Sequence, residues 1–290
     1  MQMAGNISGT TKILGVMGFP VSHSLSPAMH NAAIAKLGMD YVYVPFPIPV
    51  ENLPAAIAGL KAVESVRGFN LTIPHKVEVL PLLDEVTLIA KAVGAVNTVK
   101  RIGDQWVGTN TDVAGFLEPL KQLNYNWTER PALVLGVGGA AKAVVAGCLE
   151  LGCPVIHIVG RDSKKIKKFH GNMTSQLRDY NLRVHHWTSI PSLLEIAGIV
   201  INATPIGMAG DPNTPISEIE MALLPEQAIA YDLIYTPRPT KFLQIASARG
   251  LQAIDGVEML INQGAIALEW WLNQPIPVEV MREALLQKLA

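Results

Sequence analysis

The chain has 290 residues and a formal net charge of −1, so it is long for one compact core and predicts two domains. The near-neutral charge excludes a general electrostatic attraction to nucleic acid or anionic membranes, and we expect small-molecule partners. Hydrophobic residues make up 49% of the chain, but charged residues, Asn, Pro and Gly interrupt every apolar stretch before it could span a bilayer. Buried parallel strands explain this hydrophobic content better.

The cysteine content and the N-terminal sequence favour a reducing compartment. The N-terminal residues contain no apolar stretch of the signal-peptide type, and the only cysteines are Cys148 and Cys153, beside the end of one expected helix. We therefore expect a cytoplasmic protein.

Apolar strand-like runs alternate with helical patterns in the first third of the chain. The strand-like runs are KILGVMG, YVYVPF and VRGFNLT, and the helical patterns are PAMHNAAIAKLG, ENLPAAIAGLKAV and DEVTLIAKAVG. This alternation predicts a parallel α/β domain. At residues 95–110, two short β-rich runs flank Arg101–Asp104, which predicts a hairpin at the end of this sheet.

A second series of strands follows the helical pattern DVAGFLEPLKQL and a polar segment at residues 124–131. Its strand-like runs are ALVLG, PVIHIVG, LRVHHW, GIVINA and QAIAYDLI, and from Gly256 the chain is purely helical. The pattern predicts an α/β first domain at residues 1–112 and a second domain at residues 113–255. The C-terminal helices, residues 256–290, could pack back on the first domain.

A dinucleotide-binding fingerprint follows the strand-like run ALVLG and precedes a helical pattern, as this motif requires. The run is followed by Gly136-x-Gly138-x-x-Ala141, with Gly139 and Ala140 in between, and then by a helical pattern without breakers. Gly136 allows the tight turn, Gly138 lets the backbone approach a pyrophosphate, and Ala141 keeps helix and strand close. The helix N-terminus offers free N–H groups to the anion. We therefore predict a Rossmann-type second domain.

The residues after the next strand decide between NADP and NAD, because an arginine there binds the ribose 2′-phosphate and an acidic residue binds the 2′-hydroxyl. They read GRDSK at residues 160–164, and Arg161 with Lys164 favours NADP through charge-assisted contacts. In the alternative interpretation, Asp162 or Ser163 caps a basic solvated helix and Arg161 is a surface residue.

Two serines crowd the start of the first expected helix. Ser26 followed by Pro27 predicts an N-cap with proline at the first helical position. Ser24 lies two residues earlier, in the preceding turn, where the sequence gives it no capping role. Ser24 is therefore a candidate ligand-binding residue.

Polar residues also follow the strand-like run VRGFNLT. Asn70, Thr72 and Lys76 come at its C-terminal edge, where ligands bind in open α/β sheets. Asn97 lies in an otherwise apolar strand and Asp112 at the domain junction. Three of these residues have a structural alternative: Asn97 as a satisfied core amide, Asp112 as a helix N-cap, and Lys76 as a solvated lysine at a helix start. Together they predict a polyhydroxylated ligand.

Six motifs in this order span nearly the whole chain. They are Ser-His-Ser-Leu-Ser-Pro at 22–27, Asn-Leu-Thr-Ile-Pro-His-Lys at 70–76, Asn97-Thr98, Asn110-Thr111-Asp112, Asn-Ala-Thr-Pro-Ile-Gly-Met at 202–208, and Asp255-Gly256 with Met259-Leu260 and Gln263-Gly264. In this combination the chain resembles the shikimate dehydrogenase family. The resemblance implies a catalytic α/β domain, an inserted Rossmann domain, and returning C-terminal helices. It also implies NADP-dependent reversible reduction of 3-dehydroshikimate to shikimate, a step of aromatic amino-acid biosynthesis.

The resemblance implies a role for each matching residue. The expected substrate contacts are Ser24, Ser26 and Tyr235 at the carboxylate, and Asn70, Thr72, Asn97 and Gln263 around the ring hydroxyls. The expected cofactor residues are Gly136, Gly138, Gly139, Ala140, Ala141, Gly160, Arg161, Lys164 and Thr204, with Gly256 and Met259 on the nicotinamide side. Lys76 and Asp112 would form the acid–base pair, and which of them takes the proton stays open. The chain departs from the family's usual Asn-Arg-Thr after the second Rossmann strand, because it has Gly160-Arg161-Asp162.

Two other functions fit parts of the sequence. Asp162 suggests an NAD-using quinate/shikimate dehydrogenase, and the fold alone would suit a non-catalytic regulator that binds a dinucleotide or metabolite. The presence of both Lys76 and Asp112 argues against a regulator. The histidines form no metal-ligand set, since adjacent His185 and His186 would point to opposite faces of a strand. We expect a monomer or homodimer without nucleic-acid or membrane partners.

Overall fold

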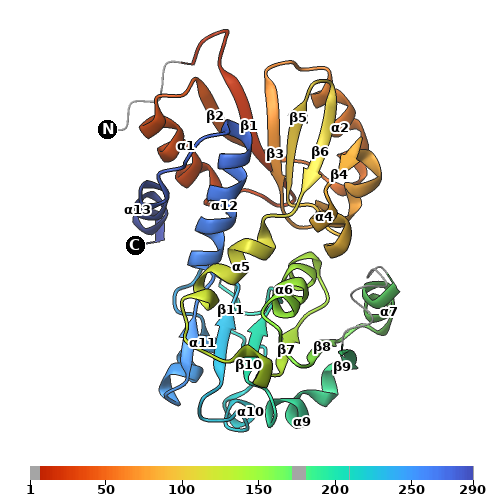
Figure 1. Cartoon of the computed structure of the whole chain (residues 1–290), viewed down its shortest axis with the longest axis vertical. Coiled ribbons are helices and arrows are strands. Elements are labelled where there is room, and N and C mark those ends of the chain that lie inside the picture. The colour runs from red at the N-terminus through yellow and green to blue at the C-terminus, as the bar shows by residue number, and fades with distance from the viewer. Residues whose placement is uncertain (1–6, 172–180, 209, 290) are drawn as a thin grey trace. The chain divides into compact units, whose positions relative to one another are not determined.

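The computed structural model describes residues 7–171, 181–208 and 210–289, which form two compact units (Figure 1). One unit comprises Met1–Thr111 with Ile261–Ala290, and the other comprises Asp112–Leu260. The sequence predicts boundaries after residues 112 and 255, and the two units divide after Thr111 and after Leu260. The α/β class with two mostly parallel sheets is confirmed.

The sheet of the first unit has six strands in the order β2-β1-β3-β5-β6-β4. The strands are β1 (Lys12–Gly18), β2 (Tyr41–Pro47), β3 (Val66–Leu71), β4 (Glu85–Val86), β5 (Thr98–Ile102) and β6 (Gln105–Thr109). β1 is parallel to β2 and β3, and β4 is parallel to β6. β5 runs antiparallel to both of its neighbours, β3 and β6.

The reversed direction of β5 brings distant segments to one edge of this sheet. Since β5 is antiparallel to β3, its N-terminal end lies at the C-terminal end of β3. β6 reverses direction again, so its C-terminal end lies at that edge too. The chain after β1, after β3, before β5 and after β6 therefore meets at the edge where open α/β sheets bind ligands. We call it the ligand edge.

The helices of the first unit cover its sheet in the order expected from the sequence. They are α1 (Ser26–Leu37), η1 (Val50–Asn52), α2 (Leu53–Lys61), α3 (His75–Glu78), η2 (Leu80–Leu82), α4 (Leu88–Val93) and α13 (Val278–Leu289), with most of α12 (Val257–Leu272). The helix expected over DEVTLIAKAVG is shorter, because Glu85 and Val86 pair with β6 as strand β4 and only Leu88–Val93 is helical. Tertiary pairing overrides the local helical pattern there.

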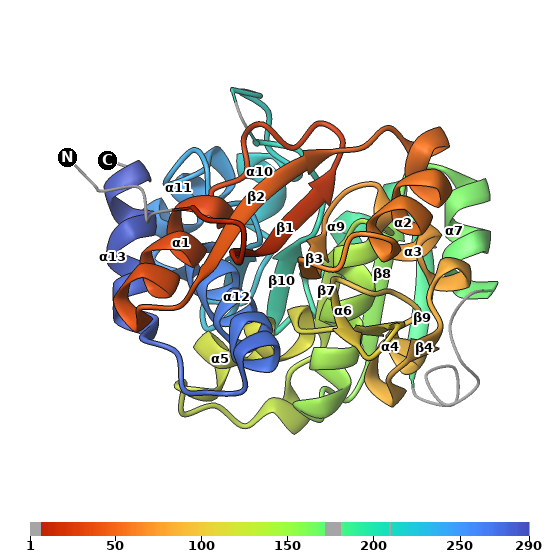
Figure 2. The same cartoon turned by 90° about the horizontal axis from the view of Figure 1, so that it is seen from above.

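The C-terminal helices pack on the first unit. α13 lies beside α1 in both views (Figures 1 and 2). In α12, the indole N–H of Trp271 donates to the carbonyl oxygen of Val99 in β5 at 2.8 Å. This buried bond ties the last helices to the sheet formed by the first third of the chain.

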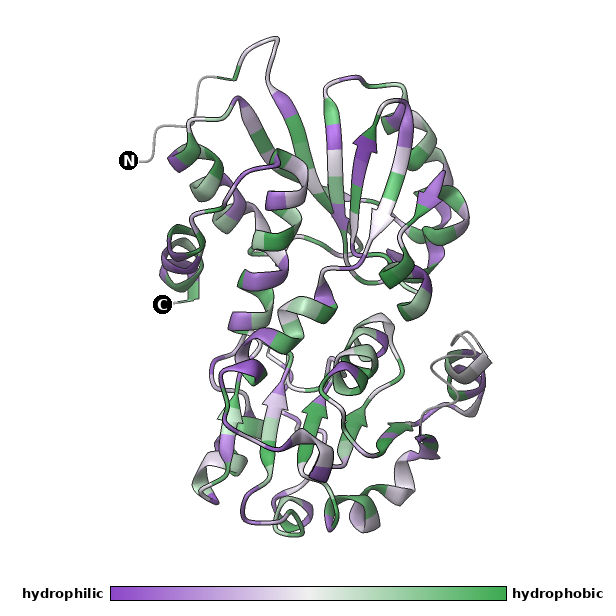
Figure 3. Cartoon of the chain, in the orientation of Figure 1, coloured by the Kyte–Doolittle hydropathy of each residue, from purple (hydrophilic) through white to green (hydrophobic). Residues whose placement is uncertain are grey.

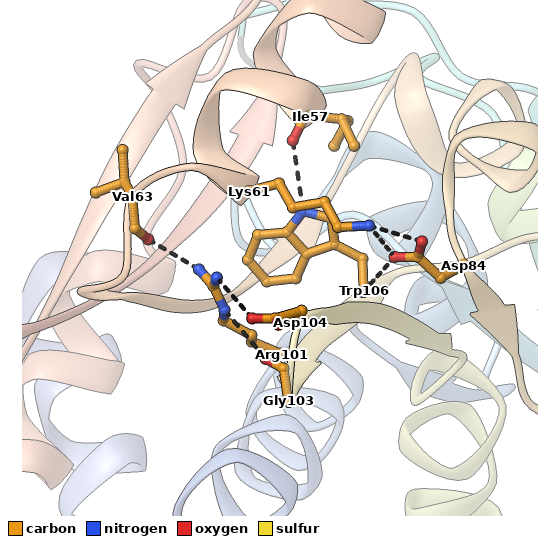
Figure 4. Close-up of polar contacts among 8 residues, drawn as sticks. All are labelled: Ile57, Lys61, Val63, Asp84, Arg101, Gly103, Asp104 and Trp106. Atoms are coloured by element: carbon orange, nitrogen blue, oxygen red, sulfur yellow. Dashed lines mark hydrogen bonds and ion pairs between the residues drawn. The ribbon is translucent and has the colours of Figure 1, made fainter.

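The expected hairpin is β5–β6, with Ile102 paired to Gln105. Gly103 has φ of 58°, the positive value that the first residue of a two-residue type II′ loop requires. Trp106 on β6 is nearly fully buried, and its indole N–H donates to the Ile57 carbonyl oxygen at 3.4 Å (Figure 4).

Charged side chains surround Trp106 (Figure 4). Asp84 accepts hydrogen bonds from Lys61 Nζ and from the Trp106 backbone N–H, both at 2.7 Å, and these bonds lower the pKa of Asp84. The Arg101 guanidinium lies 5.7 Å from the centroid of the Trp106 ring. The β5–β6 hairpin is thus fastened to α2 and to the segment before β4.

The second unit contains a six-stranded sheet in the order β12-β11-β10-β7-β8-β9, with every pair parallel. The strands are β7 (Ala132–Leu135), β8 (Ile156–Gly160), β9 (Leu182–His186), β10 (Ile199–Asn202), β11 (Ile229–Asp232) and β12 (Gln252–Ile254). Counted from β7, the order is that of the doubly wound dinucleotide-binding fold, with its topological switch between β7 and β10. The sequence predicted β7–β11 but not β12, a short and mostly exposed edge strand.

Buried apolar strands form the core of the second unit (Figure 3). All residues of β7, β8, β10 and β11 are buried, as strands covered on both faces require. The helices are α5 (Asp112–Lys121), η3 (Trp127–Glu129), α6 (Gly139–Glu150), α7 (Ser163–Gly171), η4 (Trp187–Ser189), α9 (Ile190–Leu194), α10 (Glu218–Met221) and α11 (Lys241–Ala248). Within the described residues, no helix has the length and apolar composition needed to cross a bilayer.

Candidate functional site

The serines before and at the start of α1 lie in the segment that leaves β1 at the ligand edge. The helix begins at Ser26 itself with Leu25 as its N-cap, so the expected capping role of Ser26 is wrong. Ser24 takes up part of that role, because its hydroxyl accepts a hydrogen bond from the Ser26 N–H at 3.3 Å. The Ser26 side chain is therefore not needed for capping, although it is buried to 7% exposure.

Tyr43 on β2 connects Ser26 to β3. Its phenol O–H donates to Asn70 Oδ1 at 2.7 Å, and its ring stacks on His30 of α1 with centroids 4.1 Å apart. Burial raises the pKa of Tyr43 well above its ordinary value, and a side-chain hydrogen bond with Ser26 opposes that rise. The phenol therefore remains protonated and serves as a fixed donor.

Asn70 holds the ends of β3 and β5 together. Its side-chain N–H groups donate to the backbone oxygen of Asn97 at 3.1 Å and to Thr98 Oγ1 at 2.9 Å, while its oxygen accepts from Tyr43. Both amide hydrogens are thus already committed within the protein. Asn70 is placed at the ligand edge as a residue that positions its neighbours.

Asn97 joins three motifs that are far apart in the sequence. Its Oδ1 accepts from the Thr111 N–H at 2.8 Å and from the Thr98 hydroxyl at 3.0 Å. Its Nδ2 donates to Thr111 Oγ1 at 2.9 Å and to Gln263 Oε1 of α12 at 3.2 Å. The structural interpretation of Asn97 as a satisfied buried amide is correct, and the same bonds bring Gln263 to the ligand edge.

Thr72 and Lys76 follow β3 at this edge. The Thr72 N–H donates to the Met17 carbonyl oxygen at 2.9 Å, and the Lys76 carbonyl oxygen accepts from the Val96 N–H at 2.7 Å. The latter bond fixes the backbone of Lys76 beside the residue that precedes Asn97. Lys76 lies in the single turn of α3 and its side chain is half-buried.

Asp112 is the first residue of α5 and its side chain is 4% exposed. It directly follows Thr111, the residue that bonds to Asn97, but belongs to the second unit. Lys76 belongs to the first unit, so their pairing stays a prediction.

The fingerprint loop in the second unit has the geometry that a pyrophosphate needs. Gly136 has φ of 114°, and a Cβ there would lie 2.9 Å from the Ala203 carbonyl oxygen, so only glycine fits this turn. A Cβ at Gly138 would meet no heavy atom within 4 Å, so the backbone is open to approach. α6 begins at Gly139 and Ala141 is fully buried against the sheet. The N–H groups of this helix start can receive an anion.

Thr204 lies beside this loop at the topological switch. Its Cγ2 would be 3.1 Å from a Cβ at Gly136, and its N–H and hydroxyl both donate to Asn202 Oδ1, at 3.0 and 2.6 Å. Asn202 in turn donates to Asp232 Oδ1 at 3.0 Å. Burial raises the pKa of Asp232 to about 6, although hydrogen bonds from Thr240, Ile234 and Asn202 lower it.

The turn after β8 separates the roles of Arg161 and Asp162. Asp162 Oδ1 accepts from the N–H groups of Lys164 and Lys165 at 2.7 and 3.2 Å, which confirms it as the cap of α7. Arg161 is exposed, with its guanidinium carbon 4.7 Å from the centroid of the Trp187 ring. The arginine is therefore available to an anion, whereas the aspartate is occupied by its helix.

Comparison with known proteins identifies the family. Residues 16–99 match the shikimate dehydrogenase substrate binding domain, and residues 256–286 match the shikimate 5′-dehydrogenase C-terminal domain. Over 283 residues the chain is 54% identical to the protein named shikimate dehydrogenase (NADP(+)) of Microcystis aeruginosa, an alignment covering 97% of this chain and 99% of that protein. The chain belongs to the shikimate dehydrogenase family.

Solved structures of the shikimate dehydrogenase family share the fold of the whole chain. A crystal structure of shikimate dehydrogenase in complex with NADP+ matches with a TM-score of 0.89 and 34% identity, covering 100% of both chains. The shikimate 5-dehydrogenase of Thermus thermophilus in complex with NADP(H) and shikimate matches with a TM-score of 0.81 and 35% identity, covering 96% of this chain and 99% of that one.

The residues that the shikimate dehydrogenase resemblance singled out divide between the two units. The first unit holds Ser24, Ser26, Asn70, Thr72, Lys76, Asn97 and Gln263, and the second holds Asp112, Tyr235, Gly256, Met259 and the fingerprint residues. Within the second unit, the Gly256 N–H donates to the Ile234 carbonyl oxygen at 3.1 Å, next to Tyr235. Burial raises the pKa of Tyr235. Met259 is 8% exposed.

Sequence reasoning missed several residues that support these sites. Tyr43 donates to Asn70 and stacks on His30, and Asp232 accepts from Asn202, which holds Thr204. Asn202 belongs to the sequence motif at residues 202–208 without a role of its own there, and Asp232 could have been found as a polar residue at the C-terminal end of an otherwise apolar strand. The role of Tyr43 could not be predicted, because the sequence shows it only as one of several aromatic residues in a strand-like run.

Proposed function

We propose that this chain catalyses the NADP-dependent, reversible reduction of 3-dehydroshikimate to shikimate. A relative that matches nearly the full length of the chain is named shikimate dehydrogenase (NADP(+)). The observation that carries the proposal is the hydrogen-bonded set of Asn70, Asn97 and Gln263, because it gathers polar side chains from three separate family motifs at the ligand edge. Such a set suits a ligand with several hydroxyl groups.

The second unit holds the cofactor in this proposal. The open backbone at Gly138 and the first N–H groups of α6 receive the pyrophosphate, and Arg161 with Lys164 receives the ribose 2′-phosphate. Gly160 supports this turn, Thr204 borders the fingerprint loop, and Gly256 with Met259 lines the nicotinamide side. When bound, the dinucleotide supplies the hydride for reduction and accepts it for oxidation. Since Asp162 caps α7, it no longer supports the NAD-using alternative.

The first unit binds the substrate in this proposal. The hydroxyls of Ser24 and Ser26 hold the substrate carboxylate, together with Tyr235 of the second unit. Thr72 and Gln263 contact the ring hydroxyls. Asn70 and Asn97, whose amide hydrogens are bonded within the protein, position Gln263 and the start of β5.

Lys76 and Asp112 act as a coupled acid–base pair. During reduction the pair delivers a proton to the oxygen of the reacting carbonyl, and during oxidation it takes the proton of the ring alcohol. Lys76 is half-buried and Asp112 is buried, so both side chains are partly shielded from water.

Initial-rate measurements with shikimate and quinate, each combined with NADP and NAD, test the function. We expect the highest kcat/KM for shikimate with NADP. Comparable efficiency with quinate and NAD would instead identify a quinate/shikimate dehydrogenase, and no turnover with any pair would favour a regulator. The Arg161→Ala variant should raise the KM for NADP far more than the KM for NAD.

We also propose a cellular setting for the enzyme. The near-neutral charge and the two free, buried cysteines suit a cytoplasmic enzyme that acts as a monomer or homodimer on small molecules.

A further inference from the structure

Trp187 is the first residue of η4, directly after β9, and it lies under the Arg161 side chain. The guanidinium carbon of Arg161 is 4.7 Å from the centroid of the indole ring. The ring is half-buried and packs against the apolar core of the second unit, which includes Val159, Ile190 and Leu193. Trp187 is therefore a fixed aromatic surface beneath an exposed, otherwise flexible arginine.

The backbones that carry Arg161 and Trp187 are also tied together. Gly160 and His186 are paired across strands β8 and β9. His186 Nδ1 accepts from the Thr188 N–H at 3.4 Å, which leaves its Nε2–H to donate to the Arg161 carbonyl oxygen at 3.2 Å. Both turns are thus fixed relative to each other, and the stacking of the two side chains is built into the local fold.

The contact between Arg161 and the indole ring is not a hydrogen bond. An aromatic face attracts the flat face of a guanidinium, whereas phosphate oxygens bind in the guanidinium plane, at its N–H groups. Among the described residues, no carboxylate lies within ion-pair distance of Arg161, and the Asp211 carboxylate interacts with it only at longer range. The indole therefore restricts the arginine without using any donor that a phosphate needs.

We propose that Trp187 is a positioning residue that orients Arg161 toward the ribose 2′-phosphate and so sets the preference for NADP over NAD. This inference rests on the proposed role of Arg161 in the cofactor site. Trp187 acts through the arginine: it lowers the entropy lost when the guanidinium is fixed on the phosphate. Its contribution applies only to ligands that carry the 2′-phosphate.

Two substitutions separate the aromatic face from the packing of the ring. Trp187→Leu keeps apolar volume against the core but removes the π face, and Trp187→Phe keeps a π face. Calorimetric titration with 2′,5′-ADP, which carries the 2′-phosphate without the nicotinamide, and with 5′-ADP measures binding directly. We expect Trp187→Leu to weaken 2′,5′-ADP binding by about 2- to 30-fold, the range of cation–π interactions, and to leave 5′-ADP binding unchanged. Trp187→Phe should retain most of the affinity.

Kinetics and an Arg161→Ala background complete the test. In Trp187→Leu, the KM for NADP should rise by the same factor with kcat unchanged, and the KM for NAD should stay constant. Added to Arg161→Ala, Trp187→Leu should have no further effect on 2′,5′-ADP. Equal weakening of 2′,5′-ADP and 5′-ADP, or additive effects in the double variant, would overturn the inference.

The same experiment distinguishes the two levels of the proposal. If Arg161→Ala itself leaves 2′,5′-ADP binding unchanged, the proposed cofactor role of Arg161 is wrong. If Arg161→Ala weakens binding and Trp187→Leu does not, that role stands and only the role of Trp187 is wrong. Thermal unfolding of each variant shows whether a loss of binding reflects a loss of fold.

Discussion

The side chains of Asn97 and Gln263, 166 positions apart in the sequence, are hydrogen-bonded at 3.2 Å. Asn97 precedes β5 and Gln263 lies on α12, so one bond joins the ligand edge to a C-terminal helix. Asn97 also bonds to Thr111, so its side chain holds separate chain segments together, and Gln263 is the partner that α12 supplies.

Asn97→Ala should lower the free energy of unfolding by about 1–3 kcal/mol, because the buried Thr111 N–H loses its acceptor. Gln263→Ala should lower it by less, since the bonds between Asn97 and Thr111 remain, but should raise the KM for shikimate. Denaturant titration and steady-state kinetics of both variants check this. A larger loss of stability in Gln263→Ala than in Asn97→Ala would contradict the division of roles.

Ser24 can be tested with a matched pair of variants. Ser24→Ala removes the acceptor of the Ser26 N–H and should destabilise the protein by about 0.5–2 kcal/mol. Ser24→Asp keeps an acceptor that helix starts favour, but it places a negative charge where we propose the substrate carboxylate lies. We expect near-normal thermal stability and a KM for shikimate raised at least about tenfold in Ser24→Asp. An unchanged KM in that variant would exclude Ser24 from the carboxylate site.

Lys76→Met preserves most of the side-chain length but removes the ammonium group. If Lys76 belongs to the acid–base pair, kcat should fall by about 10²- to 10⁴-fold, the usual contribution of proton transfer, while the melting temperature changes little. Lys91→Met on α4 serves as the control for the loss of a lysine. Near-normal turnover of Lys76→Met would refute the assignment.

His30 makes stability depend on pH. Burial lowers its pKa from 6.5 to about 4, against the raising effect of its backbone hydrogen bonds. Below pH 6.5 the unfolded chain therefore binds a proton at His30 that the folded chain does not, so the free energy of unfolding falls as the pH falls toward 4. Between pH 6.5 and about pH 5, His30→Gln should make the decrease in the free energy of unfolding smaller by about 1.6 kcal/mol.

Urea titrations of wild type and His30→Gln at the two pH values measure this difference. His23→Gln, which changes an exposed side chain near the same helix, is the control and should behave as wild type. An unchanged pH dependence in His30→Gln would show that other groups cause it.

Much of the fold could be predicted because its local patterns agree with its tertiary structure. Strands β7, β8, β10 and β11 are short, buried and mainly apolar runs, and the glycine spacing after β7 marks the start of α6. The hairpin could be predicted from Gly103 between two β-rich runs. Edge strands β4 and β12 could not, since two or three partly exposed residues carry no pattern and depend on pairing with β6 and β11.

The candidate site could be predicted only to the level of residue types. The sequence placed Asn70, Asn97 and Gln263 in one site through family resemblance, but not the bonds that join them. The exchange of roles between Ser24 and Ser26 depends on where α1 starts, and a shift of one residue at a helix end leaves no trace in composition. The stacking of Arg161 on Trp187 could not be predicted either, because the residues lie on separate turns that only the pairing of β8 and β9 brings together.

The reversed strand β5 has a practical consequence for engineering the protein. Because both ends of the β5–β6 hairpin lie at the ligand edge, its Gly103–Asp104 tip is at the opposite end of the sheet. The tip is exposed and its turn contains only two residues. An affinity tag or fluorophore-bearing insertion between Gly103 and Asp104 is therefore expected to leave substrate turnover intact, which makes this loop a suitable attachment point for immobilisation or labelling.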